Sequence, residues 1–254
     1  MRLVGIVGKD FPDSHVALFR ERGIDTAGLQ IADGKTFRWH GRYNKTMESR
    51  ETVSVEINVL GDFHPRLPPA YATTPFILLG NGHPATQEAV LSQAKSPRFV
   101  LLDTMNLWIA NNRSEVEGLI RRVDGLCINE EEALQLSGAG TLAEAARMIL
   151  GLGVQRLIIK QAEKGATLFA GSSEFHVPAY TAARAVDPTG AGDAFAGGVM
   201  GYLAQKNDLS RDTFRQAIVY GNVMGSLNVE GFGAEGLLAA SKEEIGRRFT
   251  SLNR

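Results

Sequence analysis

The feature of this sequence that most restricts its fold is the regular alternation of short apolar runs with longer amphipathic stretches. The apolar runs are rich in Val, Ile and Leu and occupy residues 3–8, 76–80, 99–103, 125–129 and 156–160. Between them, apolar residues recur at helical spacing over 13–23, 84–95, 113–123 and 141–153. This alternation is typical of βαβ units, in which helices cover both faces of a parallel sheet. We expect a hairpin (166–171 and 173–178) and a helical C-terminal third to follow.

Size and composition fit one soluble α/β domain that spans residues 1–254. Of the 254 residues, 44% are hydrophobic and 22% are charged, as in an ordinary globular protein. The net charge of −1 argues against a generic nucleic-acid or membrane surface. No apolar run approaches the ~20 residues of a membrane span. The N-terminus becomes charged too early for a signal peptide, so a cytoplasmic protein is expected.

The single cysteine, Cys127, excludes an intrachain disulfide and fits a reducing compartment. Its apolar neighbours favour a buried thiol over a nucleophile.

Residues 35–65 interrupt the pattern, because their apolar residues alternate at the period of a β-strand. One face of the first expected strand is aromatic and the other basic: Phe37, Trp39 and Tyr43 against Arg38, His40 and Arg42. The second expected strand has an apolar face formed by Val53, Val55, Ile57 and Val59. Two strands with one apolar face predict a lid inserted in the domain, and an edge hairpin packed on its own domain is the alternative. An exposed apolar lid also predicts a homodimer formed lid to lid.

Polar residues follow several expected strands at their carboxyl ends, where ligands gather in open α/β sheets. They are Asn81 and His83, Asp103 and Asn106, and Asn129 and Glu132. Each alone is weak evidence, since Asn and Asp also cap helices and make turns. For Asn129 the cap interpretation is as good as the functional one, because "NEEEA" also reads as a helix start.

The run "DPTGAGDAF" (187–195) predicts an anion site. Gly190, Ala191 and Gly192 present backbone N–H groups at the start of an apolar helix, and such helix starts bind anions. Asp193 falls in the first turn, where the helix dipole favours its ionised form. An anion site beside a base indicates phosphoryl transfer.

These residues resemble the signature of the ribokinase-like (PfkB) family of sugar and nucleoside kinases. The spacing of Asn129 and Glu132 is similar to that family's Asn-x-x-Glu motif. The segment "YGNVMGSLNVEGFGA" (220–234) resembles the helix and loop that close over the nucleotide. The resemblance runs along nearly the whole chain. It implies a three-layer αβα sandwich with a mostly parallel central sheet and a small β-strand lid. The implied activity is transfer of the γ-phosphate of ATP to a hydroxyl of a sugar or nucleoside.

The resemblance also implies roles for individual residues. Asp193 would be the catalytic base, and the N–H groups of Gly190, Ala191, Gly192 and Asp193 the anion hole. Asn129 and Glu132 would organise Mg²⁺ through water. Asp187 and Thr189, with carbonyls near Asn228 and Gly233, would match the monovalent-cation (K⁺) site of some relatives. The implied nucleotide contacts are Lys160, Ala162, Gly165, Asn222 and Gly233.

Acceptor contacts are expected from the lid and the strand ends. The candidates are Arg38, Trp39, Asn58, Asn81, Asp103 and Asn106, together with Asp193. The strand-end groups are acidic or neutral, which favours an unphosphorylated sugar or nucleoside, whereas the lid arginines would suit a phosphorylated acceptor.

The sequence departs from the family pattern in two places. Ala162 stands where the family's nucleotide turn usually has its first glycine, and a left-handed backbone there would cost alanine about 1 kcal/mol. Family members also open with a strand and a Gly-Gly helix start that hold the acceptor, whereas this chain begins where that segment should be finished.

The missing segment implies either a truncated form or a naturally short variant, and it leaves two main functions open. One is a kinase, favoured by Asp193, Gly190, Gly192, Asn129 and Glu132. The other is a non-catalytic relative that binds a nucleotide or sugar as a sensor. A dinucleotide-binding enzyme based on "GIVGKDF" is disfavoured, because the phosphate-binding spacing fails.

Overall fold

The computed structural model describes residues 1–44, 50–182 and 184–253 of the chain. Its residues form two compact units, where the sequence predicted one domain. The first unit comprises Met1–Thr74 and Ala85–Ser96, and the second comprises Pro75–Pro84 and Pro97–Arg254. That the two units act as one domain stays a prediction.

The second unit is built on a six-stranded sheet in the order β10-β9-β8-β7-β6-β5. Its parallel part consists of β5 (Phe76–Leu79), β6 (Phe99–Asp103), β7 (Gly125–Asn129) and β8 (Arg156–Lys160). The antiparallel hairpin of β9 (Ala166–Ala170) and β10 (Ser173–Val177) completes it. The predicted bounds of β6, β7 and β8 are confirmed, because these strands are buried and therefore read as continuous apolar runs.

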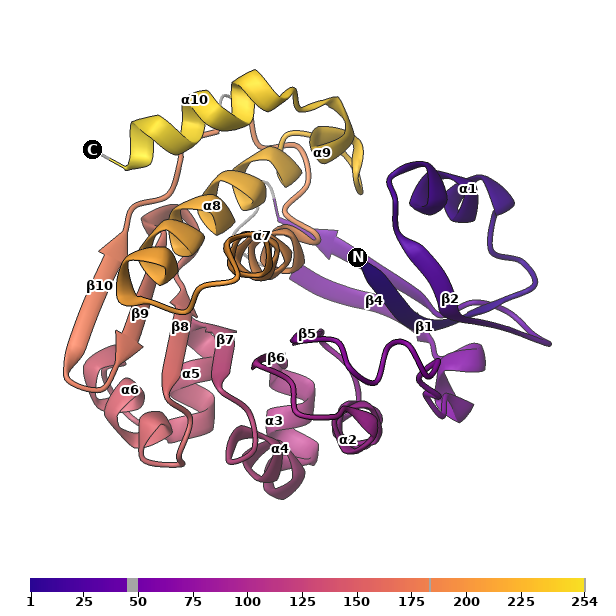
Figure 1. Cartoon of the computed structure of the whole chain (residues 1–254), viewed down its shortest axis with the longest axis horizontal. Helices are drawn as coiled ribbons and strands as arrows, with labels where there is room; N and C mark the ends of the chain where they lie inside the picture. The colour runs from indigo at the N-terminus through magenta and orange to yellow at the C-terminus, as the bar shows by residue number, and fades with distance from the viewer. Residues whose placement is uncertain (45–49, 183, 254) are drawn as a thin grey trace. The chain divides into compact units, whose positions relative to one another are not determined.

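Helices cover both faces of this sheet (Figure 1). On one face, Phe99, Leu101 and Ile158 join a buried cluster with residues of α7 (Ala191–Lys206) and α8 (Arg211–Asn228). Intervening residues such as Val100 and Leu102 point to the other face. That face carries α3 (Asn106–Asn111), α4 (Arg113–Ile120), α5 (Glu130–Ser137) and α6 (Leu142–Leu150). The short helix η2 (Ala162–Lys164) precedes β9, while α9 (Glu235–Ala239) and α10 (Lys242–Leu252) end the chain.

The first unit contains two small sheets. β1 (Arg2–Gly8) pairs in parallel with β2 (Asp25–Ala32), and α1 (Asp13–Glu21) connects them. β3 (Arg38–Tyr43) pairs antiparallel with β4 (Arg50–Glu56), and η1 (Asn58–Asp62) follows. Residues of α2 (Pro84–Gln93) from Ala85 onward also belong to this unit.

The lid strands were predicted, but the second strand is shorter than expected. β4 ends at Glu56, and Ile57 has helical backbone angles of φ −67° and ψ −40°. Val59 lies in η1, where it is buried, while Val55 and Ile57 are exposed. The strand pairing also shifts register between His40 and Gly41. The predicted apolar face of Val53, Val55, Ile57 and Val59 on one strand is therefore wrong.

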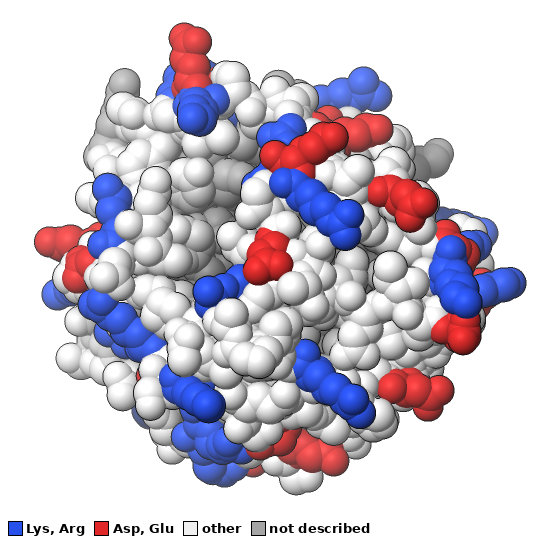
Figure 2. Space-filling view, turned by 45° about the vertical axis from the view of Figure 1, so that its right-hand side comes forward, with Lys and Arg blue, Asp and Glu red and all other residues white. Residues whose placement is uncertain are grey.

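Charged side chains of both signs are interspersed over the face in Figure 2, in keeping with the net charge of −1. Among the helices of the described residues, none has the length and apolar character required to cross a bilayer.

Candidate active site

The N-terminal turn of α7 leaves only some of the predicted donors open, because the N–H of Ala191, which the sequence placed in the anion hole, is already bonded. Gly190 caps the helix with φ +83°, and Asp187 accepts a hydrogen bond from the Thr189 N–H at 2.9 Å. The Ala191 N–H is bonded to the Pro188 carbonyl and the Ala194 N–H to the Gly190 carbonyl. Within the described residues, the N–H groups of Gly192 and Asp193 have no such acceptor. A helix start with free N–H groups binds anions.

Asp193 projects from the same turn. Its side chain is exposed and makes no hydrogen bond or ion pair with the residues that the structure describes. It is therefore available to accept a proton from a bound molecule.

A buried ion pair lies beside this turn. Lys160 ends β8 and Asp103 ends β6, and their Nζ and Oδ1 atoms are 3.4 Å apart across the end of β7. A Cβ at Gly192 would lie 3.2 Å from Lys160 Nζ, so the ammonium sits close to the helix start. Sequence analysis had placed Asp103 among the acceptor contacts, but its side chain is only 6% exposed and paired with Lys160.

Burial and neighbouring charges set the ionisation of this group. Burial raises the pKa of Asp103, and the Lys160 charge opposes that rise. Burial lowers the pKa of Lys160, but the surrounding groups, among them Asp103 and Glu132, outweigh it and raise the pKa above its ordinary value. Burial raises the pKa of Cys127 to about 12, so it stays a neutral thiol, as the sequence indicated.

Asn129 and Glu132 form a capping box at the start of α5. Asn129 Oδ1 accepts from the Glu132 N–H and Glu132 Oε2 from the Asn129 N–H, each at 2.8 Å. Glu132 is 5% exposed, and burial raises its pKa to about 7. The cap interpretation of Asn129 is therefore confirmed. Among the described residues no cluster of His, Cys, Asp and Glu side chains could hold a metal directly, and the Mg²⁺ role stays a prediction.

The predicted nucleotide contacts fall into two groups. Ala162 and Gly165 flank the turn after β8 with φ of +49° and +106°, so Ala162 has the strained backbone expected at a glycine position. Gly233, with φ +56°, lies in the exposed loop between α8 and α9. Asn222 instead is buried, and its Nδ2 donates to the Val177 and Pro178 carbonyls, which ties α8 to the end of β10.

The asparagines at the strand ends form hydrogen bonds with residues that follow the adjacent strands. Asn81 donates to Met105 Sδ at 3.2 Å and accepts from Trp108 Nε1 at 3.1 Å. The ring of His83 lies 5.0 Å from that of Trp108, edge to face. Asn106 donates to Glu131 at 2.9 Å. Trp108 and Met105 were missed by sequence reasoning, although both follow Asp103 closely in the chain.

The lid candidates of the first unit have partners within that unit. Arg38 forms an ion pair with Asp10 at 3.0 Å, and Asn58 donates to the Thr36 carbonyl at 3.0 Å. Trp39 donates to Thr52 Oγ1 at 3.2 Å, and its indole lies against Gly41, where a Cβ would be 2.0 Å from the ring. Arg38 and Asn58 therefore bind at the base of the lid, while the Trp39 indole packs against Gly41 of its own strand.

The family model for pfkB family carbohydrate kinases matches residues 70–239. The chain belongs to the PfkB family. PfkB proteins are phosphotransferases with a hydroxyl acceptor, so the predicted family and enzyme class are confirmed.

Two relatives of the PfkB family show how far the similarity extends. The chain is 31% identical to the cytidine kinase of Thermococcus kodakarensis over 205 residues, which cover 78% of this chain and 72% of that one. It is 33% identical to the aminoimidazole riboside kinase of Salmonella typhimurium over 248 residues, which cover 91% and 76%.

A solved structure supports the fold. That structure is the Salmonella enterica aminoimidazole riboside kinase complexed with aminoimidazole riboside and an ATP analogue. It matches with a TM-score of 0.73 at 25% identity, over 98% of this chain and 85% of that one. The predicted ribokinase-like fold is thus confirmed.

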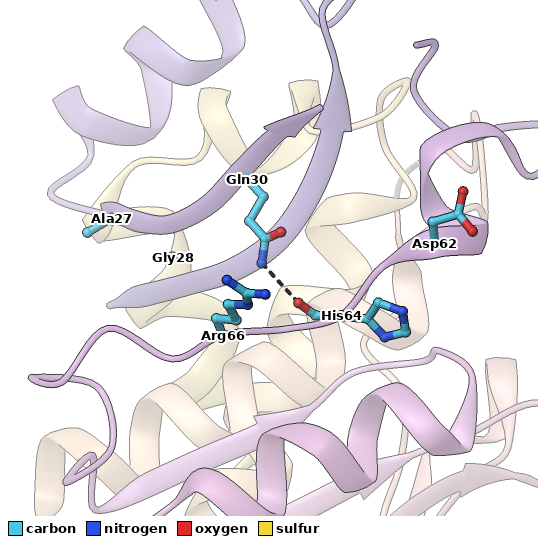
Figure 3. Close-up of a pocket in the computed structure, with 6 residues that line it drawn as sticks. All are labelled: Ala27, Gly28, Gln30, Asp62, His64 and Arg66. Atoms are coloured by element: carbon cyan, nitrogen blue, oxygen red, sulfur yellow. Dashed lines mark hydrogen bonds between the residues drawn. The ribbon is translucent and has the colours of Figure 1, made fainter. Parts of the chain in front are cut away.

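A pocket of about 420 Å³ lies in the first unit and contains none of the predicted PfkB site residues. It lies between β2 and the segment after η1, and its lining is Ala27, Gly28, Gln30, Asp62, His64 and Arg66. Figure 3 shows Gln30 donating to the His64 carbonyl, at 3.2 Å, with the Arg66 side chain close by. We assign no chemistry to it.

Proposed function

We propose that the protein is an ATP-dependent kinase that phosphorylates a hydroxyl of a nucleoside or sugar, with Asp193 as its general base. The observation that carries this is the start of α7, where unbonded N–H groups and an unpaired, exposed carboxylate occupy one helical turn. In a PfkB chain this turn supplies both things that phosphoryl transfer requires, an anion site and a proton acceptor.

In the proposed reaction Asp193 takes the proton of the acceptor hydroxyl as its oxygen attacks the γ-phosphorus of ATP. The bond between the γ-phosphorus and the bridging oxygen breaks, and ADP leaves with that electron pair. The N–H groups of Gly190, Gly192 and Asp193 stabilise the charge that spreads over the transferring oxygens. Gly190, with its left-handed backbone, turns these groups toward the phosphate.

Asn129 and Glu132 are the proposed Mg²⁺ residues. The capping box uses Asn129 Oδ1 and Glu132 Oε2, while Glu132 Oε1 has no hydrogen bond in the described part of the chain. An oxygen of this kind fits a hydrated Mg²⁺ held through water, because this ion dehydrates reluctantly. When bound, Mg²⁺ would neutralise charge on the ATP phosphates.

For the nucleotide we propose the turn of Ala162 and Gly165 and the loop around Gly233. Ala162 and Gly233 have a left-handed backbone, and Gly165 has a more extended backbone with positive φ. Such conformations can bring the main chain close to a ligand. Asp187 and Thr189 are the proposed K⁺ site, since one Asp187 oxygen and the backbone carbonyls nearby are hard ligands.

For the acceptor we propose an unphosphorylated riboside. Both relatives described above are named as kinases of ribosides, and the flat indole of Trp39 offers a stacking surface for a base. The exposed Val55 and Ile57 further lead us to propose that the lid pairs with that of a second copy. Light scattering on Val55→Glu tests this pairing: the wild type should be a dimer and the variant a monomer.

The activity is tested by a screen of ribosides, pentoses, hexoses and sugar phosphates with ATP and Mg²⁺. We expect turnover with a riboside, and a loss of kcat of about 10²–10⁴-fold in Asp193→Asn with ATP binding retained. Asp212→Asn is the matched control, because Asp212 is an exposed carboxylate in the first turn of α8. Equal loss in both variants, or full activity of Asp193→Asn, would remove Asp193 from the reaction. ATP binding without any turnover would identify a non-catalytic nucleotide-binding protein instead.

A further inference from the structure

The ammonium of Lys160 lies beside the positive end of a helix, although the acidic groups around it favour its charged form. The ammonium lies next to Gly192, in the first turn of a 16-residue helix. The N-terminus of a helix carries partial positive charge, so it repels a nearby cation and attracts an anion. The side chain is only 16% exposed, and water therefore screens this repulsion poorly.

Asp103 compensates this charge only in part. The Nζ–Oδ1 distance of 3.4 Å exceeds the 2.7–2.9 Å that is usual for a charge-assisted bond. The same Oδ1 also accepts from the Thr104 N–H at 2.9 Å. An ammonium has three donors, and among the described residues Lys160 donates a hydrogen bond to Asp103 alone. The others remain available on the side of the α7 turn.

The strand order explains why the pair lies there. Asn129 is in register with Lys160, and Asp103 with Cys127, so β7 separates the two charged residues. Their side chains nevertheless meet, with Nζ and Oδ1 3.4 Å apart, and the buried Cys127 of β7 is a neutral thiol. Replacing a buried ion pair with apolar residues often leaves the stability of a fold unchanged or raises it. Stability alone therefore gives little reason for an ion pair at this position.

We infer that Lys160 is a catalytic residue whose ammonium donates hydrogen bonds to the transferring phosphoryl group, with Asp103 as the residue that positions it. This inference rests on the proposed kinase function. The phosphoryl oxygens would lie between the α7 N–H groups and Nζ, and their negative charge would relieve the repulsion between the two. Lys160 gives up no proton in this step, because the acceptor's proton goes to Asp193 and the electron pair of the broken bond leaves with ADP.

This role differs from a contact to the adenosine part of ATP. A charge that meets the transferring group acts most strongly in the transition state and lowers kcat when it is lost, whereas an adenosine contact acts on ATP binding. The loss of one such donor typically reduces kcat about 10²–10³-fold.

The test compares Lys160→Met with Lys206→Met, the lysine at the other end of α7. Calorimetric titration gives the affinity for ADP alone and for ADP with tetrafluoroaluminate, a mimic of the transferring phosphoryl group. We expect Lys160→Met to bind ADP as the wild type does but to lose the additional affinity contributed by tetrafluoroaluminate. Turnover should fall about 10²–10³-fold in this variant and remain unchanged in Lys206→Met. Asp103→Asn should also lower kcat while ATP affinity is kept, which a purely structural residue would not do.

If Lys160→Met does not fold, the double variant Lys160→Met/Asp103→Met removes the pair without leaving a lone buried charge, and the same titrations apply. Retained affinity for ADP with tetrafluoroaluminate would overturn the inference. A parallel loss of ADP affinity would also overturn it, because Lys160 would then be a nucleotide contact. The titrations need no acceptor, so a wild type without turnover would contradict the proposed function while the role of Lys160 is still decided.

Discussion

The turn after β8 allows the cost of a close backbone approach to be separated from the cost of a positive φ. Gly165 has φ +106°, and a Cβ there would lie 2.0 Å from the Val177 carbonyl oxygen. Gly171, at the other end of β9, has φ +58° with open space around its Cβ position. The change to alanine therefore meets backbone strain at both sites and steric overlap only at Gly165.

The expected losses follow from these two terms. A left-handed backbone costs an L-residue about 1–2 kcal/mol, and the stiffer unfolded chain of alanine returns about 0.4–1 kcal/mol. Gly171→Ala should therefore lower the free energy of unfolding by about 1 kcal/mol or less. In Gly165→Ala the overlap adds about 1–3 kcal/mol and the more extreme φ about 1–3 kcal/mol, for a total of about 2–7 kcal/mol.

Thermal unfolding followed by circular dichroism measures both variants. At about 2–4 °C per kcal/mol for a chain of this size, Gly165→Ala should melt at least about 4 °C below the wild type and Gly171→Ala within about 4 °C of it. Equal shifts would refute the reasoning, since positive φ alone would then account for both losses. If the turn also holds the nucleotide, Gly165→Ala should raise the KM for ATP and Gly171→Ala should not.

Three further predictions concern Glu132, Ala162 and Arg248. The pKa of Glu132 rises from 4.5 to about 7 on folding, so the unfolded chain loses this proton at a lower pH than the folded chain does. The free energy of unfolding should therefore fall by about 3 kcal/mol as the pH rises from 4.5 to 7, because each pKa unit corresponds to about 1.4 kcal/mol. Urea titrations of the metal-free protein at pH 5 and 8 should show this fall, and Glu132→Gln should abolish it while Glu130→Gln keeps it. Ala162→Gly relieves the strain of φ +49° at the expense of a more flexible unfolded chain, and should raise the urea midpoint by the equivalent of about 0.5 kcal/mol; a lower midpoint would contradict the strained backbone. Arg248→Met removes the buried guanidinium that bonds to Glu230 and Glu244, and should lower the free energy of unfolding by about 2–4 kcal/mol in the same assay. Arg247→Met, at an exposed site, should lower it by less than about 1 kcal/mol.

Local sequence patterns predicted the parts of the structure whose causes are local. β6, β7 and β8 were predicted to the residue because strands buried on both faces are apolar throughout. The helix start at Gly190 was also predictable, because it depends on residues that are neighbours in the sequence. β2 was not predicted, because it is half exposed and mixes Gly, Gln and Asp with its apolar residues. The early end of β4 depends on Val59 reaching the core of its unit, which no pattern within the strand reveals.

The candidate site shows the same division. The motif around Asp193 could be read from the chain directly. The partners of Lys160 and Arg38 could not, since Asp103 lies 57 residues from the first and Asp10 lies 28 residues from the second. Such pairings arise only once the strand order and the loop paths are known. For this reason the sequence did not reveal that Arg38 and Asn58 bind Asp10 and Thr36 at the base of the lid, and their contact with the acceptor stays a prediction.

The packing of Trp39 against Gly41 gives this indole defined surroundings. Because the sequence has two tryptophans, this indole can also be used as a fluorescent probe. Trp39 belongs to the first unit and Trp108 to the second. Their surroundings differ: one indole lies along a strand and donates to Thr52, and the other meets the edge of the His83 ring. Trp39→Phe and Trp108→Phe therefore each leave a single tryptophan, in one chosen unit. Tryptophan emission spectra of these two variants report separately on the lid and on the second unit, without a chemical label.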